Sequence, residues 1–178
     1  MIDSSRLQAA YKKVRDELLA ERTPDGHWVG ELSSSALSTA TAVSALAIVR
    51  RRAAAELGTP HSVLSTKYSE LDGLDSAASH AIEELIFRGV NWLVRQQNPD
   101  GGFGDTDLSL SNIATTYLVV AALHLSGVAE EHAELLARAD HYLDAKGRLN
   151  GLRERYGSDK TFAVPIMTNL ALAGLVDW

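Results

Sequence analysis

A turn built from proline and two glycines interrupts a helical pattern in the middle of this chain and fixes where the backbone must change direction. Apolar residues recur at helical spacing before it, and the run Asn98-Pro-Asp-Gly-Gly102 then breaks the pattern, because proline and paired glycines do not continue a helix. Gln97 falls in the last turn of the predicted helix, and its amide can both donate and accept hydrogen bonds. We therefore predict that Gln97 ties this helix end to the start of the next helix, and that Phe103, two residues past Gly101, folds back over the junction.

The same turn occurs earlier in a weaker form. Pro24-Asp-Gly26 matches Pro99-Asp-Gly101, and Trp28 stands two residues after its glycine as Phe103 does. A helix of small apolar residues follows each turn, and the start of a third copy occurs at 138–143. Such repetition predicts antiparallel helix pairs stacked side by side, with both aromatic side chains buried against their turns.

The periodicity predicts an all-α protein with a single helical domain over residues 1–178. The predicted helices span 4–21, 36–56, 78–97, 112–126, 130–145 and 162–176, with a short turn near 150–156. No segment alternates with a period of two, so no strands are expected. Residues 57–77 contain Pro60 and two glycines, and we predict a long surface loop or flap there.

Composition excludes several classes of site. The chain contains no cysteine, which rules out disulfides and thiolate zinc sites, and its six histidines show no tight ligand spacing on a common helix face. We therefore expect no metal and no cofactor. The net charge of −6 argues against a nucleic-acid partner, because such proteins usually present a basic face.

The expected location is the cytoplasm, and the protein could there contact a membrane peripherally. No window approaches the roughly eighteen apolar residues of a membrane span, and the first residues lack the apolar core of a signal peptide. The run Arg50-Arg51-Arg52 is predicted to complement the C-terminal end of its own helix. The alternative is contact of this run with a membrane surface or a partner.

The stretch 88–103 resembles the QW motif, written loosely as [KR]-[GA]-x-x-[FYW]-[LIV]-x-x-x-Q-x-x-x-G-x-W, of class II triterpene cyclases such as squalene-hopene cyclase. The matching positions are Arg88, Gly89, Trp92, Leu93, Gln97 and Gly101, with Phe103 in place of the closing tryptophan. The earlier copy keeps Gly26 and Trp28 but departs from the pattern at Val14, Glu17 and Arg22. The resemblance covers most of the chain and corresponds to the amino-terminal part of longer proteins. It implies helix pairs that form part of an α/α barrel, with the motif residues as structural staples.

The same resemblance implies where a catalytic acid should be. Family members protonate squalene with an aspartate of an Asp-x-Asp-Asp motif in the carboxyl-terminal half, within an aromatic-lined cavity between two barrel domains. No Asp-x-Asp-Asp occurs in this chain. Asp105-Thr-Asp107 matches only the first two aspartates of that motif. Asp107 is therefore a weak catalytic candidate, and no other candidate is identified. The simpler interpretation is that both aspartates, with Ser109 or Ser111, cap the next helix.

Two functions remain open. The first is a squalene-hopene cyclase-like protein or fragment linked to hopanoid cyclisation, an isomerase by family, which lacks the acid and is inactive alone. The second is a non-catalytic helical-repeat module that binds an apolar lipid or a protein. Protein prenyltransferase β subunits share the barrel and the Gly-Gly-Phe turn, but their zinc site needs a cysteine.

Partners are expected because the predicted helices are too few to close a double-layered barrel, which leaves an apolar seam exposed. The candidates are an apolar isoprenoid or lipid, a second copy in a homodimer, or the missing carboxyl-terminal half.

Overall fold

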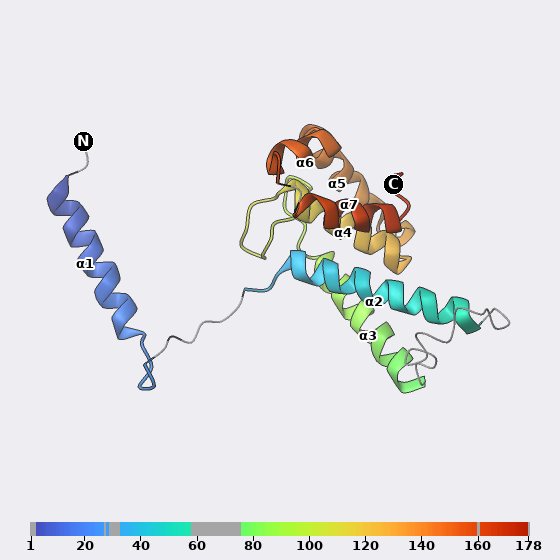
Figure 1. The fold of residues 1–178 in the computed structure, drawn as a ribbon, viewed down its shortest axis with the longest axis horizontal. Coiled ribbons are helices and arrows are strands. Elements are labelled where there is room, and N and C mark those ends of the chain that lie inside the picture. The colour runs from blue at the N-terminus through green and yellow to red at the C-terminus, as the bar shows by residue number, and fades with distance from the viewer. Residues whose placement is uncertain (1–2, 27, 29–32, 58–75, 160, 178) are drawn as a thin grey trace. The chain divides into compact units, whose positions relative to one another are not determined.

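The computed structural model describes residues 3–26, 28, 33–57, 76–159 and 161–177. In these ranges all regular elements are helices (Figure 1): α1 (Ser4–Ala20), α2 (Ala36–Leu57), α3 (Ser76–Leu93), α4 (Ile113–Ser126), the short 3-10 helix η3 (Glu130–His132), α5 (Ala133–Ala145), α6 (Arg148–Tyr156) and α7 (Ala163–Leu172). The described residues contain no strand, only an isolated bridge between Phe103 and Asn112. The predicted all-α class is therefore confirmed, whereas the α/α barrel stays a prediction.

The chain divides into two compact units, residues 1–33 and residues 34–178. Unit 1 holds α1 and the turn that follows it, and unit 2 holds the other helices. The single domain over residues 1–178 stays a prediction. Of the long loop predicted at 57–77, residues 58–75 lie outside the described residues.

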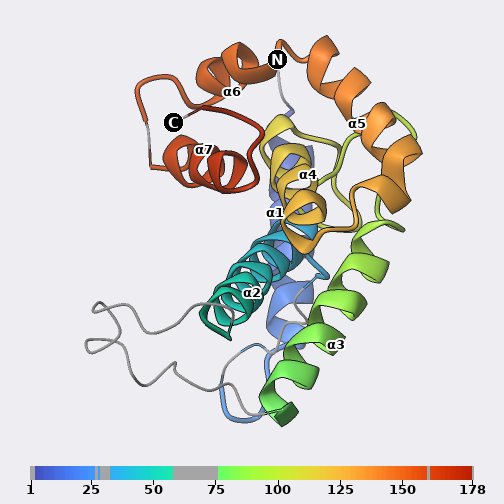
Figure 2. The same cartoon turned by 90° about the vertical axis from the view of Figure 1, so that its right-hand side faces the viewer.

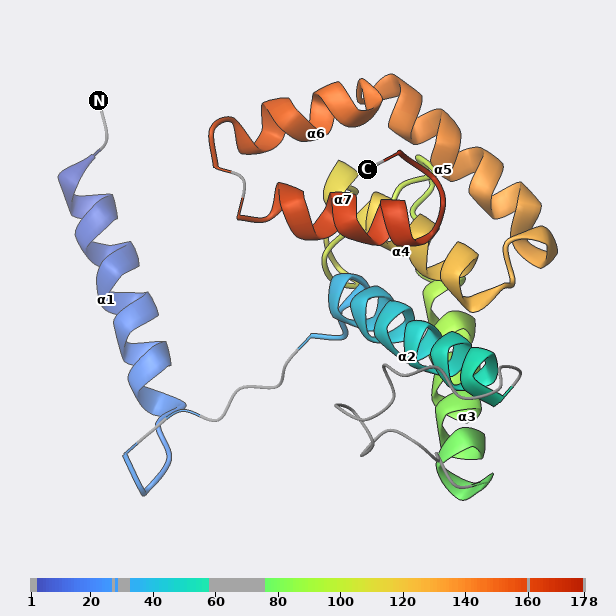
Figure 3. The same cartoon turned by 45° about the vertical axis from the view of Figure 1, so that its right-hand side comes forward.

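The centre of unit 2 is α4, which packs against α2, α5 and α7. Figure 3 shows α4 between α2 and α7, and Figure 2 shows α3 and α5 along its other side. A helix that is apolar on all faces must be covered on all faces. Twelve of the fourteen residues of α4 are buried, which makes it the core of the unit; only Val120 and His124 are partly exposed.

The helices α2 and α3 form an antiparallel pair. Arg50 Nη1 in the second half of α2 donates to Glu83 Oε2 in the first half of α3 at 2.9 Å. Toward the other end, a Cβ built on Gly89 would lie 2.5 Å from Val43 Cγ2. The small residue at this position of the motif therefore lets two helices approach closely.

Two arginines of the basic run in α2 bond to a neighbouring helix. Arg50 Nη2 donates to Ser126 O at 2.7 Å, and Arg51 Nη2 donates to His124 O at 2.8 Å. Both carbonyls belong to the last turn of α4, where carbonyls lack an i+4 partner within the helix, and His124 O also accepts from Gly127 N–H at 3.2 Å. The expectation that this run complements its own helix was wrong, because the C-terminal ends of α2 and α4 lie together.

Several predicted helix boundaries were also wrong. Helix α3 ends at Leu93 and not at residue 97, because the amides of Arg95 and Gln96 donate to the carbonyls three residues earlier. Helix α6 replaces the short turn predicted near 150–156. Helix α7 ends at Leu172 and not at 176, since Gly174 adopts a φ of +72° just past its end. No helix within the described residues is long and apolar enough to cross a membrane.

Candidate functional site

Gln97 fastens the turn after α3 to α5. Its Nε2 donates to Gly101 O at 2.8 Å and to Leu135 O at 2.9 Å, and its Oε1 accepts from Arg138 Nε at 2.9 Å and Nη2 at 2.5 Å. The prediction that Gln97 joins the next helix along the chain was wrong, because its side chain bonds to Leu135 and Arg138 of α5 and not to α4. Arg138 is the basic residue that opens the third, incomplete copy of the repeat, so its basic side chain was the signal that could have identified this partner.

Gly101 allows α5 to come this close. Its φ is +87°, a conformation that L side chains rarely adopt, and a Cβ there would lie 2.5 Å from Arg138 O. The turn is closed by Gly101 N–H donating to Asn98 O and Asn98 N–H donating to Gly102 O, each at 2.9 Å. A glycine is therefore required both by the backbone angle and by the neighbouring chain.

Phe103 is fully buried, as predicted. Its N–H donates to Thr116 Oγ1 at 3.0 Å, and its carbonyl accepts from Asn112 N–H at 2.9 Å. These two bonds attach the turn to the first residues of α4 while the ring fills the core.

A polar network that sequence reasoning missed stiffens the segment between the turn and α4. Asn98 Nδ2 donates to Ser111 Oγ at 2.9 Å, and Ser111 Oγ donates to Asp100 Oδ1 at 2.6 Å. Gly102 N–H donates to the same Asp100 oxygen at 3.0 Å. Asn98 and Asp100 are common turn residues, but their partner Ser111 comes from the far end of the segment, which no local pattern indicates.

The earlier copy of the turn is less buried than expected. Trp28 is 46% exposed, so the prediction that it is buried was wrong. Its indole N–H donates to Leu18 O at 2.6 Å, and the Arg22 guanidinium lies 5.6 Å from its ring centroid. The ring thus closes the end of α1, and Gly26 turns the chain with a φ of +85°.

The remaining motif residues have lesser roles. Trp92 is partly buried and packs against the core. Arg88 is exposed and forms an i,i+4 ion pair with Glu84 at 3.7 Å, which contributes little to stability.

The two aspartates after the turn differ in their surroundings. Asp105 Oδ1 accepts from Asn112 Nδ2 at 2.7 Å and from Thr115 Oγ1. Asn112 is the N-cap of α4 and accepts from Thr115 N–H at 3.0 Å, so the expectation that Ser109 or Ser111 caps this helix was wrong. Asp107 is exposed, and its backbone N–H donates to Ser34 O at 3.1 Å.

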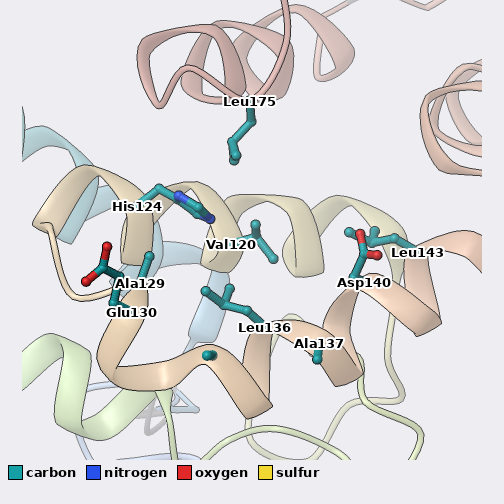
Figure 4. A pocket seen from close by; sticks show the side chains of 10 residues that line it. Val120, His124, Ala129, Glu130, Leu136, Ala137, Asp140, Leu143 and Leu175 are labelled. Carbon is teal, nitrogen blue, oxygen red and sulfur yellow. The ribbon is translucent and has the colours of Figure 1, made fainter.

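A groove of about 510 Å³ runs between α4 and α5 and is overhung by the segment after α7. Figure 4 shows Leu175 projecting toward it from above, with His124 and Val120 of α4 and Leu136 of α5 below. Its lining residues are mostly apolar: Val120, His124, Ala129, Glu130, Ala133, Leu136, Ala137, Asp140, Leu143 and Leu175. The residues of α5 recur at helical spacing, so one face of this helix forms the floor.

The groove carries negative but no permanent positive charge in its lining. Glu130 and Asp140 are its two acids, and the Asp140 carboxylate is paired with Arg148 Nη1 at 3.0 Å. Partial burial lowers the pKa of His124 from its usual 6.5, because desolvation disfavours the charged imidazolium. The groove therefore offers apolar walls to a ligand, and its lining contains no lysine or arginine that could bind an anion. Among the described residues no group of three His, Asp or Glu side chains could hold a metal ion.

Comparison with known proteins supports a coarse kinship. The chain is similar to (+)-kolavenyl diphosphate synthase of Herpetosiphon aurantiacus, a terpene cyclase, with 28% identity over 95 residues. The match covers 53% of this chain and 17% of that protein, so this chain spans a small part of the relative's length. No family model and no solved structure match. The chain is thus terpene-cyclase-like at a coarse level.

Proposed function

We propose that this chain is a helical module of the class II terpene cyclase type, similar to part of a squalene-hopene cyclase, that does not itself carry the protonating acid. The observation that carries this proposal is the placement of Asp107, whose side chain is exposed. No Asp or Glu in 3–26, 33–53, 77–159 or 161–177 is buried.

Protonating an alkene requires a strong acid in a site from which water is excluded, because water would capture the carbocation. An exposed carboxyl group is solvated and meets neither condition. The open groove between α4 and α5 likewise does not exclude water. The chain alone should therefore leave a linear polyprene uncyclised, because an acid would have to come from outside the described residues.

Product analysis tests this proposal. We expect that the purified chain, incubated with squalene or with a linear prenyl diphosphate, returns both substrates unchanged by gas chromatography and mass spectrometry. A cyclic product would overturn the proposal. Loss of that product in Asp107→Asn, with Glu130→Gln as the control, would then identify Asp107 as the acid.

The apolar groove favours a second candidate function, in which the module binds an uncharged polyprenyl chain and does not catalyse any reaction of it. Its volume lies within the range of small-molecule sites, and its lining combines aliphatic walls with two carboxylates. We expect labelled squalene to bind and a prenyl diphosphate to bind much more weakly. Ala133→Trp should block the groove, whereas Ala137→Ser should leave binding nearly unchanged. Equal binding of both ligands, or full binding by Ala133→Trp, would exclude this candidate.

A further inference from the structure

His124 places an imidazole in the wall of the α4–α5 groove. The side chain is partly buried, and Figure 4 shows it on α4 with Leu175 above and Leu136 below. Its backbone carbonyl accepts from Arg51 Nη2 and from Gly127 N–H. Its ring nitrogens, in contrast, form no hydrogen bond with another residue in the described ranges. The backbone is thus held, and the ring can bond to what fills the groove.

The imidazole of His124 matches a group that both donates and accepts a hydrogen bond. Partial burial lowers its pKa from 6.5, so the ring is neutral near pH 7. A neutral imidazole has one N–H donor and one acceptor nitrogen, and a hydroxyl group likewise donates and accepts. A hydroxyl can therefore bond to either ring nitrogen, whichever of them carries the proton.

The charged groups of the lining do not favour a charged ligand. Asp140 is already paired with Arg148, which reduces its attraction for a cation. Glu130 is exposed, so water solvates its carboxylate and screens its charge. An anionic ligand would find no lysine or arginine in the lining. An uncharged polar group next to His124 is therefore the better match.

A hydrocarbon leaves this part of the groove unsatisfied. It would displace water from the imidazole and offer no hydrogen bond in return, and a polar group that loses its partner weakens binding. A hydroxyl on the same carbon chain would replace the lost bond. The rest of the chain would meet aliphatic side chains such as Val120, Leu136 and Leu143, which favour an apolar ligand.

We therefore propose that the α4–α5 groove takes a polyprenyl alcohol in preference to the matching hydrocarbon, with the ligand hydroxyl bonded to His124 and the chain along Val120 and Leu136. His124 is then the residue that determines specificity for the head of the ligand. This inference rests on the second candidate function, to which it adds the polar head of the ligand and the residue that recognises it.

Equilibrium dialysis of the full chain with two radiolabelled probes tests the proposal. The probes are farnesol and the hydrocarbon that carries a methyl group in place of its hydroxyl. We expect farnesol to bind about tenfold more tightly. His124→Leu should bring the two affinities to about the same value while binding the hydrocarbon at least as well as the unsubstituted chain does. His124→Gln, whose amide also donates and accepts, should keep most of the preference.

The matched control is Glu130→Gln, which changes an exposed polar residue of the same lining and should keep the preference for farnesol. Equal binding of the two probes by the unsubstituted chain would overturn this inference and leave the second candidate function standing. A preference that survives in His124→Leu but is lost in Glu130→Gln would overturn the role of His124. Binding of neither probe would overturn both the inference and the second candidate function.

Discussion

Replacing Gln97 with alanine should lower the free energy of unfolding by about 3 kcal/mol. The substitution removes the donor to two backbone carbonyls, Gly101 O and Leu135 O, and the acceptor of Arg138. Each neutral bond contributes about 1 kcal/mol, and the bond from the charged but exposed Arg138 contributes roughly as much after solvent screening. For a domain of this size, the loss corresponds to a fall in Tm of roughly 6–12 °C.

Urea unfolding followed by circular dichroism measures the change, and the adjacent glutamine supplies a matched control. Gln96 Nε2 makes one long contact, 3.5 Å to Trp92 O in the preceding helix. Gln96→Ala should therefore cost under about 0.5 kcal/mol. In a double-mutant cycle, Gln97→Ala and Arg138→Ala should couple by about 1 kcal/mol. Equal effects of the two glutamine substitutions, with no coupling to Arg138, would refute the role of Gln97 as the link between the turn and α5.

Three further predictions concern stability. Gly101→Ala should cost about 3 kcal/mol in urea unfolding, because it combines a positive φ with a clash at the α5 backbone; Gly127→Ala, with a similar φ and open space, should cost only about 1 kcal/mol. The lowered pKa of His124 means that protonation favours the unfolded state, so its contribution to stability is present above pH 6.5 and lost as the pH falls below that value. His124→Gln should reduce the loss of stability between pH 7.5 and pH 5.5, and an NMR titration that places its pKa above 6.5 would contradict this. Phe103→Ala should lower the free energy of unfolding by about 4 kcal/mol, whereas Trp28→Ala should lower it by under about 1.5 kcal/mol, because only Phe103 is buried. Similar losses for the two variants in calorimetry would contradict this difference in burial.

Local chemistry explains which features were predictable. The positive φ of Gly101 follows from the Pro-Asp-Gly-Gly sequence, because such a sequence favours a tight turn with a glycine in the left-handed region. The burial of α4 follows from its largely apolar sequence, which is unbroken over residues 118–123. The closing aromatic of the turn was correctly predicted to be buried for Phe103, which has α4 to pack against. In each case the determining residues lie within a few positions of one another.

Features that depend on distant segments were not predictable in this way. Gln97 bonds to α5, which is about forty residues away in sequence, and nothing near Gln97 indicates that partner. Arg50 and Arg51 bond to α4 for the same kind of reason, since only the packing of α2 places the two helix ends together. The exposure of Trp28 was missed because the repeat suggested an equivalent environment, whereas among the described residues of unit 1 its ring meets the end of α1 and Arg22.

The groove was missed altogether, because its walls come from α4, α5 and the segment after α7. Leu136 and Leu175 lie far apart in sequence, and each reads as an ordinary core position. His124 gave a polar signal within a largely apolar helix.

We propose above all that this module does not cyclise a polyprene, and the second candidate function adds that an uncharged polyprenyl chain binds in the α4–α5 groove. Methyl-labelled protein titrated with squalene, followed by recovery of the ligand, tests both parts in one sample. The account predicts chemical-shift changes at Val120, Leu136, Leu143 and Leu175, none at the exposed loop residue Leu108, and squalene recovered intact. Shift changes confined to other methyl groups, or a cyclic product in the recovered ligand, would contradict it.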